Sequence, residues 1–310
     1  MNQAWGKFWG RVSLLIAASL CFPTLQAQIS LAQSAAFSIA QAQSHNQTAV
    51  EALNRGLELI QQGQLEQAIA AFQQATTLDP TLSPAHYNLG LALRQSGQIQ
   101  AAANAFYQAT QTDPEFALAH ANLGAALLEG NNLPQANSYL QQAIALDPNL
   151  GVAHYNLGIV QKQQGNLSAA ITSLRQAIEL TPNAPEPHYN LGLIHLQQNQ
   201  PDVALKSFQQ AIKIYPNYAE AHYSLGTILF NQGKLTEALD AFRSSAQANS
   251  NYANSYYSAG LVFIQLGQYA DAQRVLQYAR DLYAAQRNST WTARAQAQLE
   301  RVQTLNSQSR

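Results

Sequence analysis

The stretch "HYNLGLALRQSGQIQAAANAFYQATQTDP", His86 to Pro114, decides the fold, because its pattern returns with a 34-residue period. Each copy carries a glycine, and these glycines are Gly56, Gly90, Gly124, Gly158, Gly192, Gly226 and Gly260. An alanine, a large apolar residue and a small residue follow each glycine at fixed distances, as Ala102, Phe106 and Ala109 follow Gly90. A fixed period of this length is typical of proteins in which each copy is one structural unit.

The pattern of each unit predicts two helices joined by a short turn. The first helix, as in "AHYNLGLALRQSG", ends at a residue that breaks helices, and these residues are Gly63, Gly97, Asn131, Gly165, Asn199, Gly233 and Gly267. Proline ends the second helix in five units, because it cannot continue the backbone hydrogen bonds. We expect Gly90 to let the two helices approach closely, with Ala102 completing the contact.

This pattern resembles the tetratricopeptide repeat (TPR) family, whose Leu-Gly, Ala, Phe, Ala and Pro stand at matching intervals from Ala49 to about Tyr283. The resemblance implies an all-α, right-handed superhelical solenoid of antiparallel helix pairs, with the first helices lining a concave face. Two departures stand out: histidine replaces the family's frequent tryptophan, and Ser250 and Ala284 replace the last two prolines. Terminal repeats are often atypical because they cap the stack.

Four segments follow from this pattern. Residues 1–27 resemble a signal peptide, with Lys7 and Arg11 before an apolar stretch and a small-residue cleavage site after Ala27. Residues 28–48 are expected to be a flexible Gln/Ala/Ser-rich linker, residues 49–286 seven TPR units, and residues 287–310 a capping helix and tail. In that last helix Thr290 is the expected N-cap, and Trp291, Ala295 and Leu299 form its apolar stripe. We therefore expect a periplasmic or secreted protein.

Two alternatives to a cleaved signal peptide remain. The segment could be retained as an N-terminal membrane anchor, although its apolar run, Val12 to Phe22, is short for a membrane span. Alternatively, Cys21, the only cysteine, could be acylated as in a lipoprotein, but Leu20 stands where that motif prefers a small residue.

Composition and motifs argue against several functions. With 16 Lys+Arg, 17 Asp+Glu and a formal net charge of -1, the chain lacks the basic excess that nucleic-acid binding requires. The histidines at equivalent repeat positions, His86, His120, His154, His188 and His222, are too far apart to share a metal ion, so each is expected to bond a neighbouring backbone group. We expect no cofactor, no metal and no enzyme. TPR arrays precede catalytic domains in some glycosyltransferases, but the stretch 284–310 is too short for such a domain.

The helical period places two repeating columns on the expected concave face. One column consists of Asn54, Asn88, Asn122, Asn156 and Asn190, continued by Ser224 and Ser258. The other consists of Tyr87, Tyr155, Tyr189, Tyr223 and Tyr257. Asparagine offers a donor and an acceptor to the backbone of an extended peptide, and tyrosine is common at interfaces. A similar asparagine column occurs in TPR proteins that hold extended peptides; alternatively, the asparagines only fix the helices.

These columns favour a non-enzymatic scaffold that binds an extended segment of another protein. A TPR site for a C-terminal carboxylate does not fit, because Tyr87 and Tyr155 stand where lysine is needed and Glu186 and Glu220 occupy two further basic positions. The expected partner segment is therefore neutral or mildly basic. The alternative is a structural or assembly factor, or a homo-oligomer, in cell-envelope or polysaccharide-export machinery.

Overall fold

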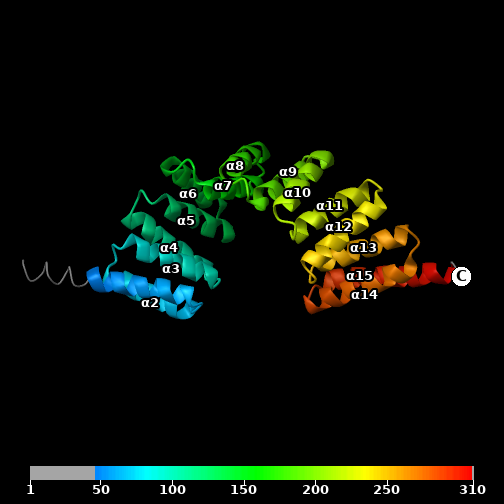
Figure 1. Cartoon of the computed structure of the whole chain (residues 1–310), viewed down its shortest axis with the longest axis horizontal. Helices are drawn as coiled ribbons and strands as arrows, with labels where there is room; N and C mark the ends of the chain where they lie inside the picture. Colours follow the sequence, from blue (N-terminus) through cyan, green and yellow to red (C-terminus); the bar gives the residue numbers. More distant parts are fainter. Residues whose placement is uncertain (1–45, 309–310) are drawn as a thin grey trace, which may run out of the picture.

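The computed structural model describes residues 46–308, which form an arch of helices joined by short turns (Figure 1). The first helix occupies residues 46–61, so the last three residues of the expected linker, 46–48, are helical. The others are α2 (Leu65–Leu78), α3 (Ser83–Gln95), α4 (Ile99–Thr112), α5 (Ala117–Glu129), α6 (Leu133–Leu146), α7 (Gly151–Gln163), α8 (Leu167–Leu180), α9 (Pro185–Gln197), α10 (Pro201–Ile214), α11 (Ala219–Asn231), α12 (Leu235–Ala248), α13 (Ala253–Gln265), α14 (Tyr269–Ala285) and α15 (Ser289–Gln308).

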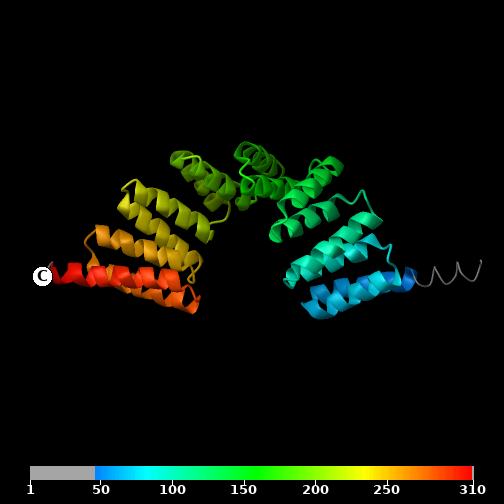
Figure 2. The same ribbon diagram turned by 180° about the vertical axis from the view of Figure 1, so that it is seen from behind.

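Within the described range, the helices form seven antiparallel pairs that stack in chain order, with α15 packed on the last pair (Figures 1 and 2). First helices of consecutive pairs also contact one another, as α5 contacts α7, α7 contacts α9 and α11 contacts α13. Second helices of consecutive pairs do not approach each other to the same extent. Elements that lie closer together occupy the inner side of a curved stack, so the first helices line the inner face. The expected all-α solenoid of helix pairs is confirmed.

The turn within each pair depends on one residue with positive φ. This residue is a glycine in five pairs, for example Gly97 at 80°, and an asparagine in two, Asn131 at 59° and Asn199 at 58°. All seven residues expected to break the first helices occupy this conformation. The turn between α14 and α15 uses the same conformation at Arg287, with φ of 56°, which the sequence does not predict.

The link between consecutive pairs is tied to the next first helix by a histidine. His86 Nε2 lies 2.9 Å from the carbonyl oxygen of Pro80. The same bond joins His120 to Pro114, His154 to Pro148 and His222 to Pro216 at 2.8–3.0 Å. Burial lowers the pKa of His188, whose side chain makes no such bond to a described residue. For four of the five histidines, the expected bond to a backbone group is confirmed.

Close packing within each pair depends on the glycine of the first helix and the large apolar residue that faces it from the second helix. A Cβ atom at Gly90 would lie 2.6 Å from the ring of Phe106, and one at Gly192 would lie 2.5 Å from the ring of Phe208. Both phenylalanines are fully buried. The expected partner, Ala102, is buried nearby but does not make the closest contact with Gly90, because the bulky ring projects further from its helix.

The last helix covers the final pair as expected. Ala295, Leu299 and Val302 of α15 are buried, and Leu299 and Val302 pack against Ala272 and Leu276 of α14. The helix begins two residues earlier than predicted, because Asn288 Oδ1, and not Thr290, accepts a hydrogen bond from the backbone of the first turn.

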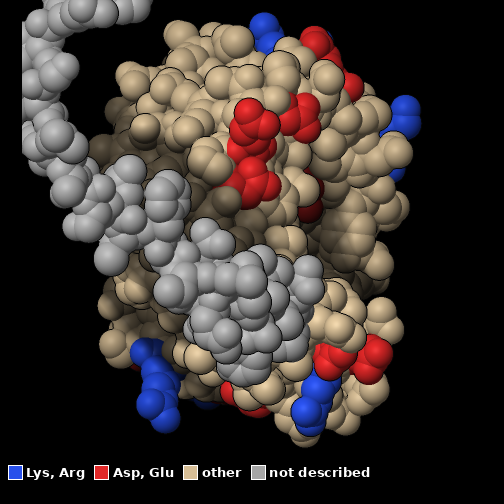
Figure 3. Space-filling view, turned by 90° about the vertical axis from the view of Figure 1, so that its left-hand side faces the viewer, with Lys and Arg blue, Asp and Glu red and all other residues tan. Residues whose placement is uncertain are grey.

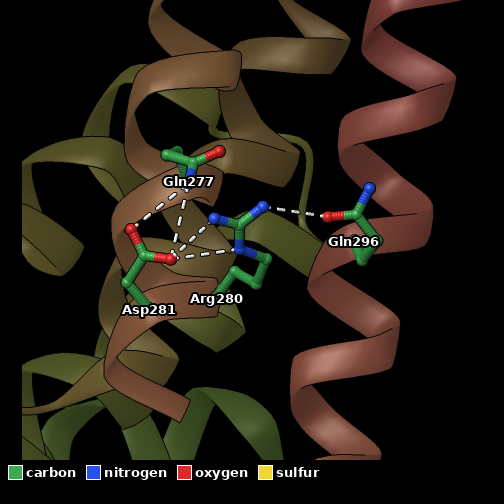
Figure 4. Close-up of polar contacts among 4 residues, drawn as sticks. All are labelled: Gln277, Arg280, Asp281 and Gln296. Carbon is green, nitrogen blue, oxygen red and sulfur yellow. Dashed lines mark hydrogen bonds and ion pairs between the residues drawn. The ribbon is translucent and has the colours of Figure 1, made fainter. Parts of the chain in front are cut away.

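Polar contacts join the same two helices. Figure 4 shows one of them, in which Arg280 of α14 donates to Gln296 of α15 at 3.1 Å while also pairing with Asp281. The guanidinium thus connects the last pair to its cap at the edge of the apolar contact.

The loss of the last two prolines has different effects on α12 and α14. Helix α14 extends to 17 residues, whereas α12 keeps 14. After α12 the turn is held by Asn249, whose Oδ1 accepts from the backbone nitrogen of Asn251 at 3.0 Å. The equivalent residue in the last unit is the buried Tyr283, which cannot form this bond, and α14 continues past it.

Charged side chains are sparse on the surface. Figure 3 shows one end of the molecule, where several acidic side chains gather in one place and basic side chains lie singly near the margins. Between residues 46 and 308, no helix is both long and apolar enough to span a membrane. In the same part of the chain, no cluster of three or more His, Cys, Asp or Glu residues is arranged to hold a metal ion.

Candidate functional site

The tyrosine column lies at the joints between consecutive pairs. The ring of Tyr87 packs between Phe106 of its own pair, at 5.8 Å between centroids, and Phe116, which precedes the next first helix, at 4.8 Å. Tyr189 repeats this arrangement with Phe208 and Tyr218, at 5.6 and 5.1 Å. Both tyrosines are half-buried. Their rings therefore stabilise the stack while one edge faces the inner surface.

Tyr223 and Tyr257 occupy equivalent places further along. Tyr223 packs against Phe242 at 5.8 Å and Tyr252 at 5.3 Å. Tyr257 packs near Leu276, which takes the place of the phenylalanine, and meets Trp291 of α15 at 5.4 Å. The column thus continues to the C-terminal cap.

The asparagine column connects one pair to the next. Asn122 Nδ2 donates to the Tyr87 hydroxyl at 3.2 Å and to its own helix at the Leu118 carbonyl at 3.0 Å. Asn190 Nδ2 donates in the same way to the Tyr155 hydroxyl at 3.4 Å and to a carbonyl of its own helix at 3.0 Å. Each of these amides has both donors engaged. Oδ1 is therefore the remaining polar group of Asn122, whereas Asn190 Oδ1 accepts a hydrogen bond from Lys162.

The remaining asparagines differ in whether their side-chain amides form hydrogen bonds. Asn88 donates to the Pro84 carbonyl at 2.8 Å. Half-buried Asn156 and exposed Asn54 make no hydrogen bond with another described residue. The interpretation that asparagine fixes the helices therefore holds for Asn88, Asn122 and Asn190, whereas Asn54 and Asn156 keep their whole amide available.

Two basic side chains of the first helices, Arg94 and Lys162, are already engaged, whereas the exposed Arg55 makes no ion pair with another described residue. Arg94 forms an ion pair with Glu129 on the next first helix, α5. Lys162 Nζ donates to Asn190 Oδ1 at 2.6 Å, and desolvation lowers the pKa of this half-buried amine. Neither cation is free to meet a carboxylate.

Two glutamates at the starts of α9 and α11 lie among the tyrosines. Burial raises the pKa of Tyr218 well above its ordinary value, and the neighbouring charges of Glu186 and Glu220 raise it further. Burial likewise raises the pKa of Tyr252 to about 12, with Glu220 again contributing. Neither glutamate carboxylate makes an ion pair with another described residue. We call this set the acidic tyrosine patch: Tyr155, Glu186, Tyr189, Tyr218, Glu220, Tyr223 and Tyr252.

Sequence reasoning misses Tyr218 and Tyr252 as members of this surface. The available signal is their spacing, because they recur with the period of the repeat and each directly precedes a first helix. The equivalent residue before α5 is Phe116, but Leu150 and Ala184 stand before α7 and α9. This aromatic column is therefore interrupted, which hides it from a search for regular patterns.

The raised tyrosine pKa values predict alkaline unfolding. Burial raises the pKa of Tyr155, Tyr189, Tyr218, Tyr252 and Tyr283 in the folded protein. A group whose pKa is raised on folding contributes stability below its unfolded pKa, about 10 for tyrosine, and loses that contribution as the pH rises through the folded value. We expect the denaturation midpoint to fall steeply above about pH 10, together with the rise in tyrosinate absorbance. A midpoint that stays constant while tyrosinate forms would contradict this prediction.

Comparisons with known proteins agree with this architecture. Models described as tetratricopeptide repeats match residues 87–151, 189–253 and 139–172, and a model described as TPR repeat matches residues 56–93 and 160–199. Together they cover residues 56–253 without a gap. The chain belongs to the tetratricopeptide repeat (TPR) family. A comparison with curated proteins finds no match.

Several solved structures are similar to this chain, and the first two named here share its fold. PilF of Pseudomonas aeruginosa is 22% identical with a TM-score of 0.62, covering 71% of this chain and 98% of its own. A TPR protein of Parabacteroides merdae ATCC 43184 is 16% identical with a TM-score of 0.63, covering 81% and 99%. YrrB, described as a TPR protein with an unusual peptide-binding site, is 26% identical with a TM-score of 0.49, covering 63% and 99%.

The TPR fold is that of a protein–protein interaction scaffold, and TPR repeat proteins are generally non-enzymatic.

Proposed function

We propose that this TPR protein binds an extended segment of another protein along its inner face, over the acidic tyrosine patch. The observation that carries the proposal is the patch itself, where half-buried tyrosine rings lie beside Glu186 and Glu220, which pair with no cation among the described residues. Tyrosine contributes a rigid apolar body and a polar tip at interfaces. Its rings also attract cations placed over their faces.

The exposed polar groups favour a segment that supplies hydrogen-bond donors and positive charge. Asn122 presents an acceptor oxygen because its amide nitrogen is engaged, and the glutamates are acceptors only. A segment rich in Lys or Arg, with its backbone N–H groups turned to the asparagines, fits this surface better than an acidic one. This sharpens the expected neutral or mildly basic partner toward the basic end.

Export from the cytoplasm is part of the proposal. It is supported only by the resemblance of residues 1–27 to a signal peptide, and these residues lie outside those that the structure describes. Fractionation of the native cells, with the mass of the mature protein, would test it. An intact N-terminus in the cytoplasmic fraction would contradict it.

The binding proposal is tested with a captured partner. Protein lacking residues 1–27 is used to capture partners from native extract, and a peptide covering the mapped segment is titrated by calorimetry. Replacing Glu186 and Glu220 together by glutamine should weaken binding by several-fold to about tenfold at low salt, with a smaller salt dependence than the wild type.

The matched control replaces the exposed Glu179 and Glu237 of the second helices by glutamine, which makes the same change in net charge away from the inner face. Asn156→Ala adds a neutral test, since this amide holds no other described residue. Unchanged affinity in both inner-face variants, or an equal loss in the control, would contradict the proposal. A stable multimer without a captured partner would favour the homo-oligomer.

A further inference from the structure

The last pair lacks one large side chain that the five preceding pairs possess. Directly before the glycine of each of those first helices stands a leucine, in the order Leu89, Leu123, Leu157, Leu191 and Leu225. These leucines pack against second helices, as Leu225 packs in a cluster with Leu239 and Phe242 of α12. In α13 the equivalent residue is Ala259, which packs in the same cluster with a much shorter side chain.

A cavity lies beside Ala259. Its volume is about 170 Å³, and its apolar lining includes Leu239, Phe242, Ala246, Phe263 and Val275. The lining therefore comes from α12, α13 and α14. Cavities of about 150 Å³ lined by such side chains bind a single benzene ring. The truncation from leucine to alanine thus leaves room for one aromatic ring.

Two arginines stand at the rim of this cavity. Arg243 and Arg274 contribute to its lining, but both guanidinium groups are largely exposed. Each is paired with an aspartate of its own helix, Arg243 with Asp240 at 3.0 Å and Arg274 with Asp271 at 2.8 Å. Their charges are thus directed to the solvent side, and the interior of the cavity is apolar.

The cavity has a route to the surface. A second, more open recess of about 410 Å³ shares Tyr256, Arg274 and Val275 with its lining. Tyr256 and Tyr278 meet edge to face at 4.6 Å along this recess. Tyr256 stands where the five preceding pairs have histidine, so the passage also results from the atypical sequence of the last unit.

One polar side chain in the wall has a defined hydrogen-bonding role. Ser245 Oγ donates to the Ala219 carbonyl at 2.7 Å, and Ser255 Oγ lies 2.7 Å from Ser245 Oγ. A carbonyl can only accept, so Ser245 uses its proton there and Ser255 must donate to Ser245. Ser255 lines the cavity and is fully buried. Because its proton is donated to Ser245, its hydroxyl oxygen can only accept a further hydrogen bond. A bound molecule that donates a hydrogen bond to Ser255 therefore fits this wall of the cavity.

We propose that the cavity between α12, α13 and α14 binds a small uncharged molecule with one aromatic ring or indole and a hydrogen-bond donor. The volume sets the ring size, the apolar interior excludes an ionised group, and Ser255 selects the donor. The site lies between α12, α13 and α14 and shares no lining residue with the acidic tyrosine patch. Its failure would leave the proposed function untouched.

The test uses phenol and indole as probes, with toluene as the probe that lacks a donor. Binding to the protein without residues 1–27 is followed by ligand-observed NMR and calorimetry. Ala259→Leu restores the leucine of the five preceding pairs, so it should raise the thermal midpoint and weaken phenol binding at least tenfold. Ala297→Leu adds the same side chain at an exposed site of α15 and should leave binding unchanged.

Ser255→Ala separates the two parts of the proposal, because Ser245 keeps its bond to Ala219. This variant should lose the preference for phenol over toluene while still binding toluene. Absence of saturable binding by all three probes would overturn the proposal, as would equal phenol affinity in the wild type and Ala259→Leu. An unchanged preference in Ser255→Ala would overturn the assignment of the donor.

Discussion

Phe208→Ala is expected to lower the free energy of unfolding by about 3–5 kcal/mol, the usual loss for a buried phenylalanine. The ring is fully buried, lies against Gly192 of its own pair and contacts the ring of Tyr189 at 5.6 Å between centroids. Its removal loses the free energy gained by burying the apolar ring, and it leaves a cavity between α9 and α10. Urea denaturation followed by circular dichroism measures the loss.

Gly192→Ala supplies the second half of a double-mutant cycle. In the wild type the new Cβ would lie 2.5 Å from Phe208 Cε1, so overpacking should destabilise the protein by about 1–3 kcal/mol. In the Phe208→Ala background that atom has room, and alanine is favoured over glycine in a helix by about 1 kcal/mol. The effect of Gly192→Ala on the free energy of unfolding should therefore change from destabilising to stabilising. Destabilisation of equal size in both backgrounds would contradict the assigned contact.

The 34-residue period is sufficient to predict the helix pairs and their turns. Positive φ at Asn131 and Gly97 follows from which residues tolerate that conformation, and such residues recur at the break of each unit. Spacing shows that Ala102 and Phe106 both face Gly90, but it does not show that the ring of Phe106 lies nearest to the glycine. The sequence misses Arg287 because arginine gives no signal for positive φ.

The candidate surface is predicted only in part. The tyrosine and asparagine columns follow from the helical period, but a period cannot show that Asn122 uses its donors on Tyr87 and its own helix. Within its own unit, each of Glu186 and Glu220 shows only that a basic residue of a carboxylate-binding TPR site is missing. The stacking of the helix pairs places both glutamates near the same tyrosines, and the acidic character of the patch arises from that arrangement.

Val302→Asp in α15 is expected to destabilise the C-terminal end by roughly 3 kcal/mol or more, because an unpaired carboxylate would replace a fully buried apolar side chain. Val302 packs with Leu299 of its own helix and with Ala272 and Leu276 of α14. Stability in repeat proteins is close to a sum of units and nearest-neighbour contacts. The loss should therefore concentrate in α13–α15 and decay toward the N-terminal pairs.

Hydrogen exchange read by mass spectrometry distinguishes this local loss from general unfolding. In Val302→Asp, the amides of α14 should exchange much faster, whereas those of α3 to α6 should keep the wild-type rate. Gln303→Asp is the matched control, because it adds the same charge at the neighbouring, exposed position. If both variants exchange alike, burial at residue 302 is not what holds the cap. If protection falls equally in all pairs, the chain unfolds as one cooperative unit, and α15 stabilises the whole stack and not its end alone.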